Sequence, residues 1–232
     1  MRKQSVAQLM GVDKSYRIGG IEIRALKGIN LSFVPGEFTS LVGPTGSGWP
    51  TLLSIIGCLS RPSSGRVIVA DTDVTRAEET LLDELRLKRI GFLSQAFNLI
   101  PNMTAFENIE LVLRMAGRGE GSIDGKVAEM LSSVDLDGKE TSVPRRLSRF
   151  EVTRLAIAKS LANDPVLLVC DDPTANLEEE EAGQILGLLG RFNEERGTTI
   201  ILGTGSLKIA ARTRRVIGMA DGRTVPADMG DG

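Results

Sequence analysis

Residues 38–51 read FTSLVGPTGSGWPT, and this stretch decides the fold. Its first part, FTSLV, predicts a buried β-strand that runs into a glycine-rich turn. The apolar run TLLSIIGCL, which starts at Thr51, then predicts a short helix. A strand that enters a helix through such a turn presents backbone N–H groups to an anion. The stretch therefore has the setting of a phosphate-binding loop.

The loop departs from the phosphate-binding pattern G-x-x-x-x-G-K-[ST] at two positions. Gly43, Gly46 and Gly48 match the glycine spacing, but Trp49 and Pro50 occupy the places of lysine and serine or threonine. An indole offers one neutral donor instead of a positive charge, and proline has neither a hydroxyl for Mg²⁺ nor a backbone N–H. Proline is tolerated in the first turn of a helix. We therefore expect the fold to survive and the grip on a triphosphate to be lost.

A dinucleotide-binding fingerprint, G-x-G-x-x-G, is the alternative for the same glycines. In the segment GSGWPT, Thr51 falls where the third glycine of that fingerprint belongs. The sequence therefore disfavours a dinucleotide-binding fingerprint, and the motifs in the rest of the chain distinguish the two kinds of loop.

Outside the loop, predicted strands alternate with predicted helices. Apolar residues recur at every second position from Ile21 to Ala25 and again from Ile29 to Phe33, and VLLVCDD at residues 166–172 suits a central strand covered on both faces. TTIILGT at residues 198–204 predicts a second buried strand. RRVIGMADGRTV, which follows, predicts a closing hairpin with Asp221-Gly222 at its turn. The alternation predicts an α/β core with a parallel sheet, and the mainly helical stretch 97–163 an inserted lobe.

Composition limits the function. The 232 residues carry 28 basic and 30 acidic side chains, and a net charge of −2 offers no electrostatic footprint for nucleic acid. The N-terminus lacks the apolar stretch of a secretory signal, and the longest apolar run, 52–59, is too short to span a bilayer. Cys58 and Cys170 lie in separate apolar stretches, so we expect two buried, reduced thiols. These features predict a cytoplasmic protein that reaches a membrane only through a partner.

Taken together, the motifs resemble those of the nucleotide-binding domain of ABC transporters, nearest to the lipoprotein-release and macrolide-export type. RIGFLSQAFNLIPNMTAFENI (89–109) resembles the Q-loop segment, VLLVCDDPTANLE (166–178) resembles Walker B and the D-loop, and LSRFE (147–151) lies at the LSGGQ signature. Family-like segments run from about Tyr16 to Val225 in the family's order and spacing. The resemblance implies a single domain, 1–232, with a P-loop NTPase (RecA-like) α/β core. That core would comprise 1–96 and 164–232 with an antiparallel β subdomain, and 97–163 would form the inserted α-helical lobe.

The resemblance also implies ATP and Mg²⁺ as cofactors and assigns roles to individual residues. Tyr16 matches the aromatic residue that stacks on adenine, with an edge-strand aromatic as the simpler alternative. The implied nucleotide-binding set is Tyr16, Gly43, Gly46, Ser47, Gly48, Trp49, Pro50, Thr51, Gln95, Ser148 and Arg149. Gln95 and Asp171 match the residues that sense or orient Mg²⁺. Asp172 lies at the catalytic glutamate position and Gly205 at the switch histidine position.

Several of these positions depart from the family. Asp172 is one methylene shorter than glutamate, and a displacement of about 1 Å can cost on the order of 10²-fold in rate. Gly205 has no side chain, and the chain contains 0 histidines. Arg149 and Phe150 replace signature glycines that let a helix N-terminus approach phosphate, although Arg149 could contact phosphate itself. The combined losses predict a pseudo-ATPase, because phosphoryl transfer depends on positioning and electrostatic stabilisation.

The resemblance implies two partners. One is a membrane permease, for which Phe97, Leu99, Ile100 and Pro101 offer an apolar patch, with internal packing as the alternative for each residue. The other is a second nucleotide-binding subunit, in a homodimer or a heterodimer. The expected location is therefore the cytoplasm, peripheral on the inner face of the membrane. Two other functions remain open: a working transport ATPase in which Arg149 and Lys159 supply charge, and a soluble regulatory scaffold without a permease.

Overall fold

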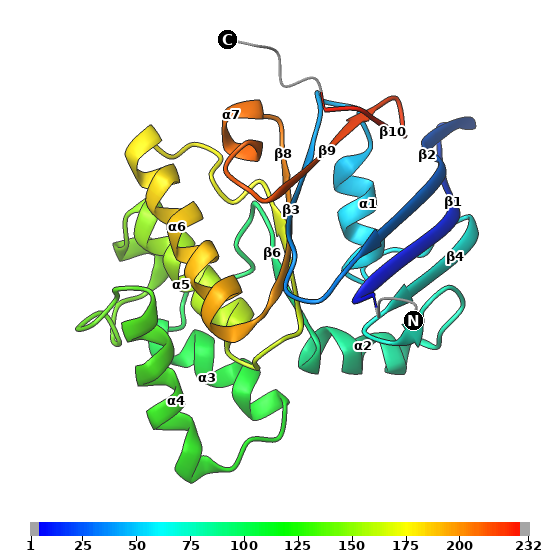
Figure 1. Cartoon of the computed structure of the whole chain (residues 1–232). Helices are drawn as coiled ribbons and strands as arrows, with labels where there is room; N and C mark the ends of the chain where they lie inside the picture. The colour runs from blue at the N-terminus through cyan, green and yellow to red at the C-terminus, as the bar shows by residue number, and fades with distance from the viewer. Residues whose placement is uncertain (1–4, 228–232) are drawn as a thin grey trace.

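The computed structural model describes residues 5–227, which form two β-sheets and their covering helices (Figure 1). The strands are β1 (Ala7–Ile18), β2 (Ile21–Phe33), β3 (Phe38–Val42), β4 (Ser64–Val69), β5 (Thr72–Asp73), β6 (Ile90–Leu93), β7 (Leu167–Asp171), β8 (Thr199–Thr204), β9 (Arg215–Ala220) and β10 (Arg223–Val225). The helices are α1 (Trp49–Ile56), α2 (Glu79–Lys88), α3 (Ala105–Met115), α4 (Glu120–Ser133), α5 (Arg149–Leu161), α6 (Glu179–Arg196) and α7 (Leu207–Ala210), with a 3₁₀ turn, η1, at Pro144–Arg146.

The larger sheet has the strand order β10-β9-β3-β8-β7-β6. All neighbouring pairs in it are parallel except β9 and β10, which form an antiparallel hairpin across Asp221 and Gly222. The second sheet, β2-β1-β4-β5, is antiparallel. The predicted α/β core with a parallel sheet, an antiparallel β portion and a closing hairpin is therefore confirmed.

Helix α1 lies between the two sheets, as Figure 1 shows. Side chains alternate across a strand, so successive residues of β8 face opposite sides. Ile201 packs in the cluster that contains α1, β1 and β2, whereas Ile200 and Leu202 pack in the cluster on the other face. Gly203, two residues after Ile201, therefore faces α1, and this placement matters for the site.

The other face of the large sheet is covered by α5 and α6, with α3 and α4 packed against α5 (Figure 1). Residues of all four helices belong to one hydrophobic cluster that also includes Leu168 of β7 and Ile200 of β8. The predicted helical stretch 97–163 thus contains α3, α4 and α5, and it shares its core with the sheet. The boundaries at 97 and 163 stay a prediction.

The N-terminal strand was not predicted, and the period-two pattern after it is only partly a core pattern. Strand β1 occupies residues 7–18 and pairs with both β2 and β4. The side chains of Ile21 and Ile23 are 68% and 48% exposed, whereas Leu26, Ile29 and Phe33 are buried. The β1–β2 pairing shifts register at several points, so one alternation does not hold along the whole strand.

Both cysteines are free and buried, as expected. Burial raises the pKa of the Cys58 thiol to about 11 and raises the pKa of Cys170 further. No helix within residues 5–227 combines the length and the apolar character needed to cross a membrane.

Candidate functional site

The glycine-rich loop, residues 43–48, connects β3 to α1 at the carboxyl ends of the parallel strands, where α/β folds bind ligands. Two backbone hydrogen bonds connect the loop to β2 through the β9–β10 turn: the Gly222 N–H donates to Ser47 O, and the Lys27 N–H donates to Gly222 O. Gly48 has φ +99°, and a Cβ there would lie 2.5 Å from the Ala25 carbonyl oxygen. Glycine is therefore required at this position by conformation and by space.

The N-terminus of α1 keeps part of an anion-binding arrangement. Gly48 is the N-cap residue, without a side-chain cap, and the first turn carries no acidic residue. The first N–H groups of any helix lack an intrahelical partner. Pro50 removes one of these donors, so the nest retains its shape with fewer N–H groups.

The Trp49 side chain points inward. It is 9% exposed and belongs to the hydrophobic cluster around α1. Its indole N–H donates to the Gly43 carbonyl oxygen over 3.2 Å. The sequence left open whether this side chain fills the space at the loop or swings outward, and the structure places it inside. The only polar donor of the side chain is thereby used within the loop itself.

Two adjacent carboxylates lie at the end of β7. Asp171 and Asp172 are both partly buried, and burial raises the pKa of each; for Asp171 the neighbouring Asp172 carboxylate raises the pKa further. The Asp172 backbone N–H donates to Gly203 O at 2.9 Å, and the Thr204 hydroxyl donates to the Asp172 carboxylate at 3.3 Å. In the large sheet, β8 lies between β3 and β7. The two carboxylates are therefore two strands away from β3, the strand that enters the glycine-rich loop.

Asp171→Asn is expected to stabilise the protein at pH 7. Because the pKa of Asp171 is raised in the folded state, the folded protein holds the proton more tightly, and stability falls as the pH rises through that pKa. The gain in unfolding free energy from asparagine should be complete above the raised pKa of Asp171. It should disappear as the pH falls to 3.8, the ordinary pKa of an aspartate side chain. Urea unfolding at a series of pH values measures it. Asp124→Asn, at an exposed position on α4, is the control, and an equal response of the two variants would contradict the assignment.

The remaining residues assigned to the metal and the switch lie on exposed turns. Gln95 follows β6, and Gly205 follows β8; both are exposed. Within residues 5–227, no group of three or more His, Cys, Asp or Glu side chains gathers that could hold a metal ion alone. Mg²⁺ in nucleotide sites takes few protein ligands and relies on phosphate oxygens, so the assignment of Asp171 to Mg²⁺ stays a prediction.

The signature segment uses its polar groups within the chain. Ser148 caps α5: its hydroxyl accepts from the Glu151 N–H, and the Glu151 carboxylate accepts from the Ser148 N–H. The Arg149 guanidinium lies 4.6 Å from the centre of the Phe97 ring and donates to Ala175 O at 3.4 Å. Arg149 thus joins the start of α5 to the Q-loop segment and the D-loop segment. No spacing in the sequence predicted this contact.

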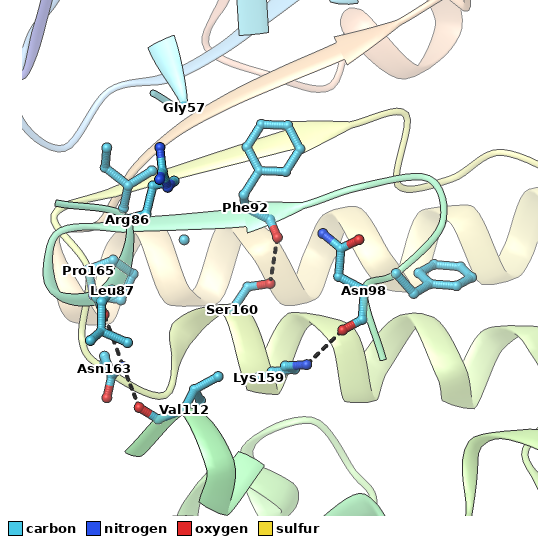
Figure 2. A pocket seen from close by; sticks show the side chains of 13 residues that line it. Gly57, Arg86, Leu87, Phe92, Asn98, Val112, Lys159, Ser160, Asn163 and Pro165 are labelled. Carbon is cyan, nitrogen blue, oxygen red and sulfur yellow. Dashed lines mark hydrogen bonds between the residues drawn. The ribbon is translucent and has the colours of Figure 1, made fainter. Parts of the chain in front are cut away.

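The other two residues that the sequence singled out have separate surroundings. Tyr16 is 37% exposed near the end of β1, and the Lys14 ammonium lies 5.0 Å from its ring centre. Lys159 is partly buried on α5 and donates to Asn98 O at 2.6 Å. Lys159 lines a hollow of about 190 Å³ whose lining contains no residue of the glycine-rich loop (Figure 2).

A parallel sheet whose first core strand enters a helix through a glycine-rich loop, with acids ending the strand two positions away in the sheet, defines a P-loop nucleotide-binding protein. The family model of the ABC transporter matches residues 26–175, and the chain belongs to that family as its ATP-binding domain.

Relatives and solved structures agree with this assignment. The chain is 38% identical to an uncharacterised ABC transporter ATP-binding protein, MJ0796, of Methanocaldococcus jannaschii, over 93% of each chain. It is 36% identical to the lipoprotein-releasing system ATP-binding protein LolD 1 of Rhodopseudomonas palustris, over 94% of this chain and 97% of that one. A dimeric structure of the MJ0796 cassette bound to ADP and Pi matches with a TM-score of 0.87 and 37% identity, over 94% of this chain and 96% of that chain.

Proposed function

We propose that this ATP-binding-type subunit is hydrolysis-deficient and serves as a structural or regulatory half of an ABC transport complex, docked on a membrane permease. The observation that carries the proposal is the position of Trp49. At the place of the phosphate-binding lysine, an uncharged side chain is buried against β8, with its one donor bound to Gly43 O. The loop therefore has a formed shape and lacks the charge that holds β- and γ-phosphates.

The electrostatics of the site support weak nucleotide binding at most. Asp171 and Asp172 add negative charge where a triphosphate would lie, and the lysine that would offset it is absent. The two cations considered as substitutes for the lysine are engaged elsewhere: Arg149 with Phe97 and Ala175, and Lys159 with Asn98. The residues present thus do not fit a tightly held triphosphate, although Asp171 would still suit Mg²⁺.

A hollow beside the Q-loop segment supports the docking half of the proposal. Figure 2 shows it between the end of α2, β6, the loop around Asn98, and α5. Phe97, Leu99 and Ile100 of the expected apolar patch are partly buried, and Phe97 and Leu99 pack on the core, so the patch is fixed in place. Lys159 takes part in no ion pair with another described residue, so an acidic side chain of the permease would find a charge partner in this hollow.

Three further parts of the proposal come from the family. A second nucleotide-binding subunit would pair with this chain, as in the dimeric cassette structures, in a homodimer or a heterodimer. The location would be the inner face of the cell membrane, through the permease. With defects both in its own loop and in its signature segment, this chain would weaken both nucleotide sites of such a dimer.

ATP turnover by the purified protein tests the proposal. We expect no phosphate release above background in Mg-ATP, alone or with a partner subunit, because several electrostatic groups are missing and each typically contributes on the order of 10²-fold or more. Turnover that Asp171→Asn abolishes would contradict the proposal. Direct calorimetry with Mg-ATP and with ADP then separates a nucleotide-sensing subunit, which binds saturably, from a purely structural one.

A further inference from the structure

The indole of Trp49 and the backbone of Gly203 occupy adjoining space between α1 and β8. A Cβ at Gly203 would lie 2.2 Å from Cε3 and 2.6 Å from Cζ3 of the Trp49 ring, and 2.7 Å from Cδ1 of Leu53. Non-bonded carbon atoms do not approach each other to less than about 3 Å, so no residue with a side chain fits beneath this indole. Gly203 lies inside a strand and has no positive φ, so its backbone conformation does not require glycine. Glycine is required instead by the lack of space beneath the Trp49 ring.

We propose that Trp49 and Gly203 form a matched plug that holds the glycine-rich loop in its formed shape without a nucleotide. On one side the indole N–H binds the carbonyl of Gly43, the first residue of the loop. On the other side the ring lies over Gly203, whose carbonyl accepts from the Asp172 N–H. The loop, β8 and the carboxylate pair are thereby joined by contacts within the protein.

This inference goes beyond the loss of hydrolysis, although it concerns the same loop. A loop that had only lost its lysine would leave the side chain at position 49 without a specific partner. Here the replacement is buried, hydrogen-bonded and fitted to a glycine that lies 154 positions further along the chain. The plug therefore makes the loop a permanent part of the core, and the subunit keeps one site conformation whatever the nucleotide concentration.

A double-mutant cycle between positions 49 and 203 tests the plug. Gly203→Ala in the natural chain should displace the indole, lower the thermal unfolding midpoint by roughly 5 to 10 °C, and shift the emission of Trp49, the only tryptophan, to longer wavelength with stronger acrylamide quenching. In the Trp49→Leu background no ring covers position 203, and the Leu53 methyl group can move into the vacated space. The same substitution should therefore lower the midpoint by less than roughly 2 °C. Leucine keeps position 49 apolar, so the background is expected to stay folded although part of the indole volume is lost.

Gly187→Ala on α6 is the matched control, because a Cβ there meets no atom within 4 Å, and it should not lower the midpoint. If Gly203→Ala lowers the midpoint equally in both backgrounds, or leaves the Trp49 emission unchanged, the plug is wrong. These outcomes are independent of ATP turnover. If the double-mutant cycle shows no coupling and the protein does not hydrolyse ATP, only the plug is overturned. If the cycle shows the expected coupling but the protein hydrolyses ATP, only the proposed function is overturned.

Discussion

Trp49→Lys combined with Pro50→Ser is expected to bind Mg-ATP on the order of 100-fold more tightly than the natural chain, because each charge-assisted contact contributes about 1.5 to 3 kcal/mol. Lysine restores a positive charge at the loop, and serine restores a hydroxyl and a backbone N–H. The same variant is expected to lose roughly 2 to 4 kcal/mol of unfolding free energy, because the buried indole leaves a cavity over Gly203. Calorimetric titration and urea unfolding measure the two effects.

Trp49→Leu with Pro50→Ser is the matched control, because it removes the indole and restores the hydroxyl without adding charge. It should bind nucleotide far less tightly than the lysine variant, because it lacks the positive charge. A gain in affinity for the lysine variant alone would also exclude the alternative that Arg149 and Lys159 already supply the charge. Equal affinity of the natural chain and the lysine variant would contradict the proposed role of position 49.

Asn108→Ala is expected to lower the free energy of unfolding by roughly 2 to 4 kcal/mol. The Asn108 side chain is fully buried on α3 and fixes the preceding loop. Its oxygen accepts from the Ile100 N–H at 2.8 Å, and its amide donates to the carbonyls of Ile100, Met103 and Thr104 at 3.0 to 3.1 Å. Alanine leaves these backbone groups without their partner in a site that holds no substitute.

Urea unfolding measures this loss, and amide hydrogen exchange should show faster exchange in residues 98–104. Asn30→Ala is the control: Asn30 also makes two backbone hydrogen bonds, to Gly11 and Gly28, but it is exposed, so water replaces them and the expected loss is below about 1 kcal/mol. Equal losses for the two variants would contradict the role given to Asn108. The loop carries Leu99, Ile100 and Pro101. Its disorder in the variant would therefore also lower the affinity for any partner that docks on these residues.

The sequence predicts the parts of the fold that depend on local pattern. The buried strand before the glycines, the run ending at Asp171, and the hairpin at Asp221-Gly222 all carry short-range signals, and the structure contains each of them. Strand β1 carries a weaker signal, because its pairing with β2 shifts register and its polar residues interrupt the alternation. It therefore went unpredicted.

The geometry of the site depends on contacts between distant segments, which a single sequence does not reveal. The sequence identifies Trp49 as a departure, but the direction of its side chain is decided by Gly203, which the parallel pairing of β3 with β8 brings alongside. Likewise, the charge of Arg149 is visible in the sequence, and its stacking on Phe97 is not. The roles that the family assigns to these residues therefore remain proposals.

The central position of β3 also has a consequence for biosynthesis. Its five residues are all buried, and its neighbours on both sides, β8 and β9, come much later in the sequence. Phe38 pairs with Ile200, so at about 5 to 20 residues per second the ribosome delivers the partner of β3 roughly 8 to 30 s after β3 itself. During that interval an apolar strand waits unpaired, in a topology whose long-range pairing is intrinsically slow. Early packing of α1 against β1 and β2, or a chaperone, would shield this segment from aggregation until β8 and β9 have been made.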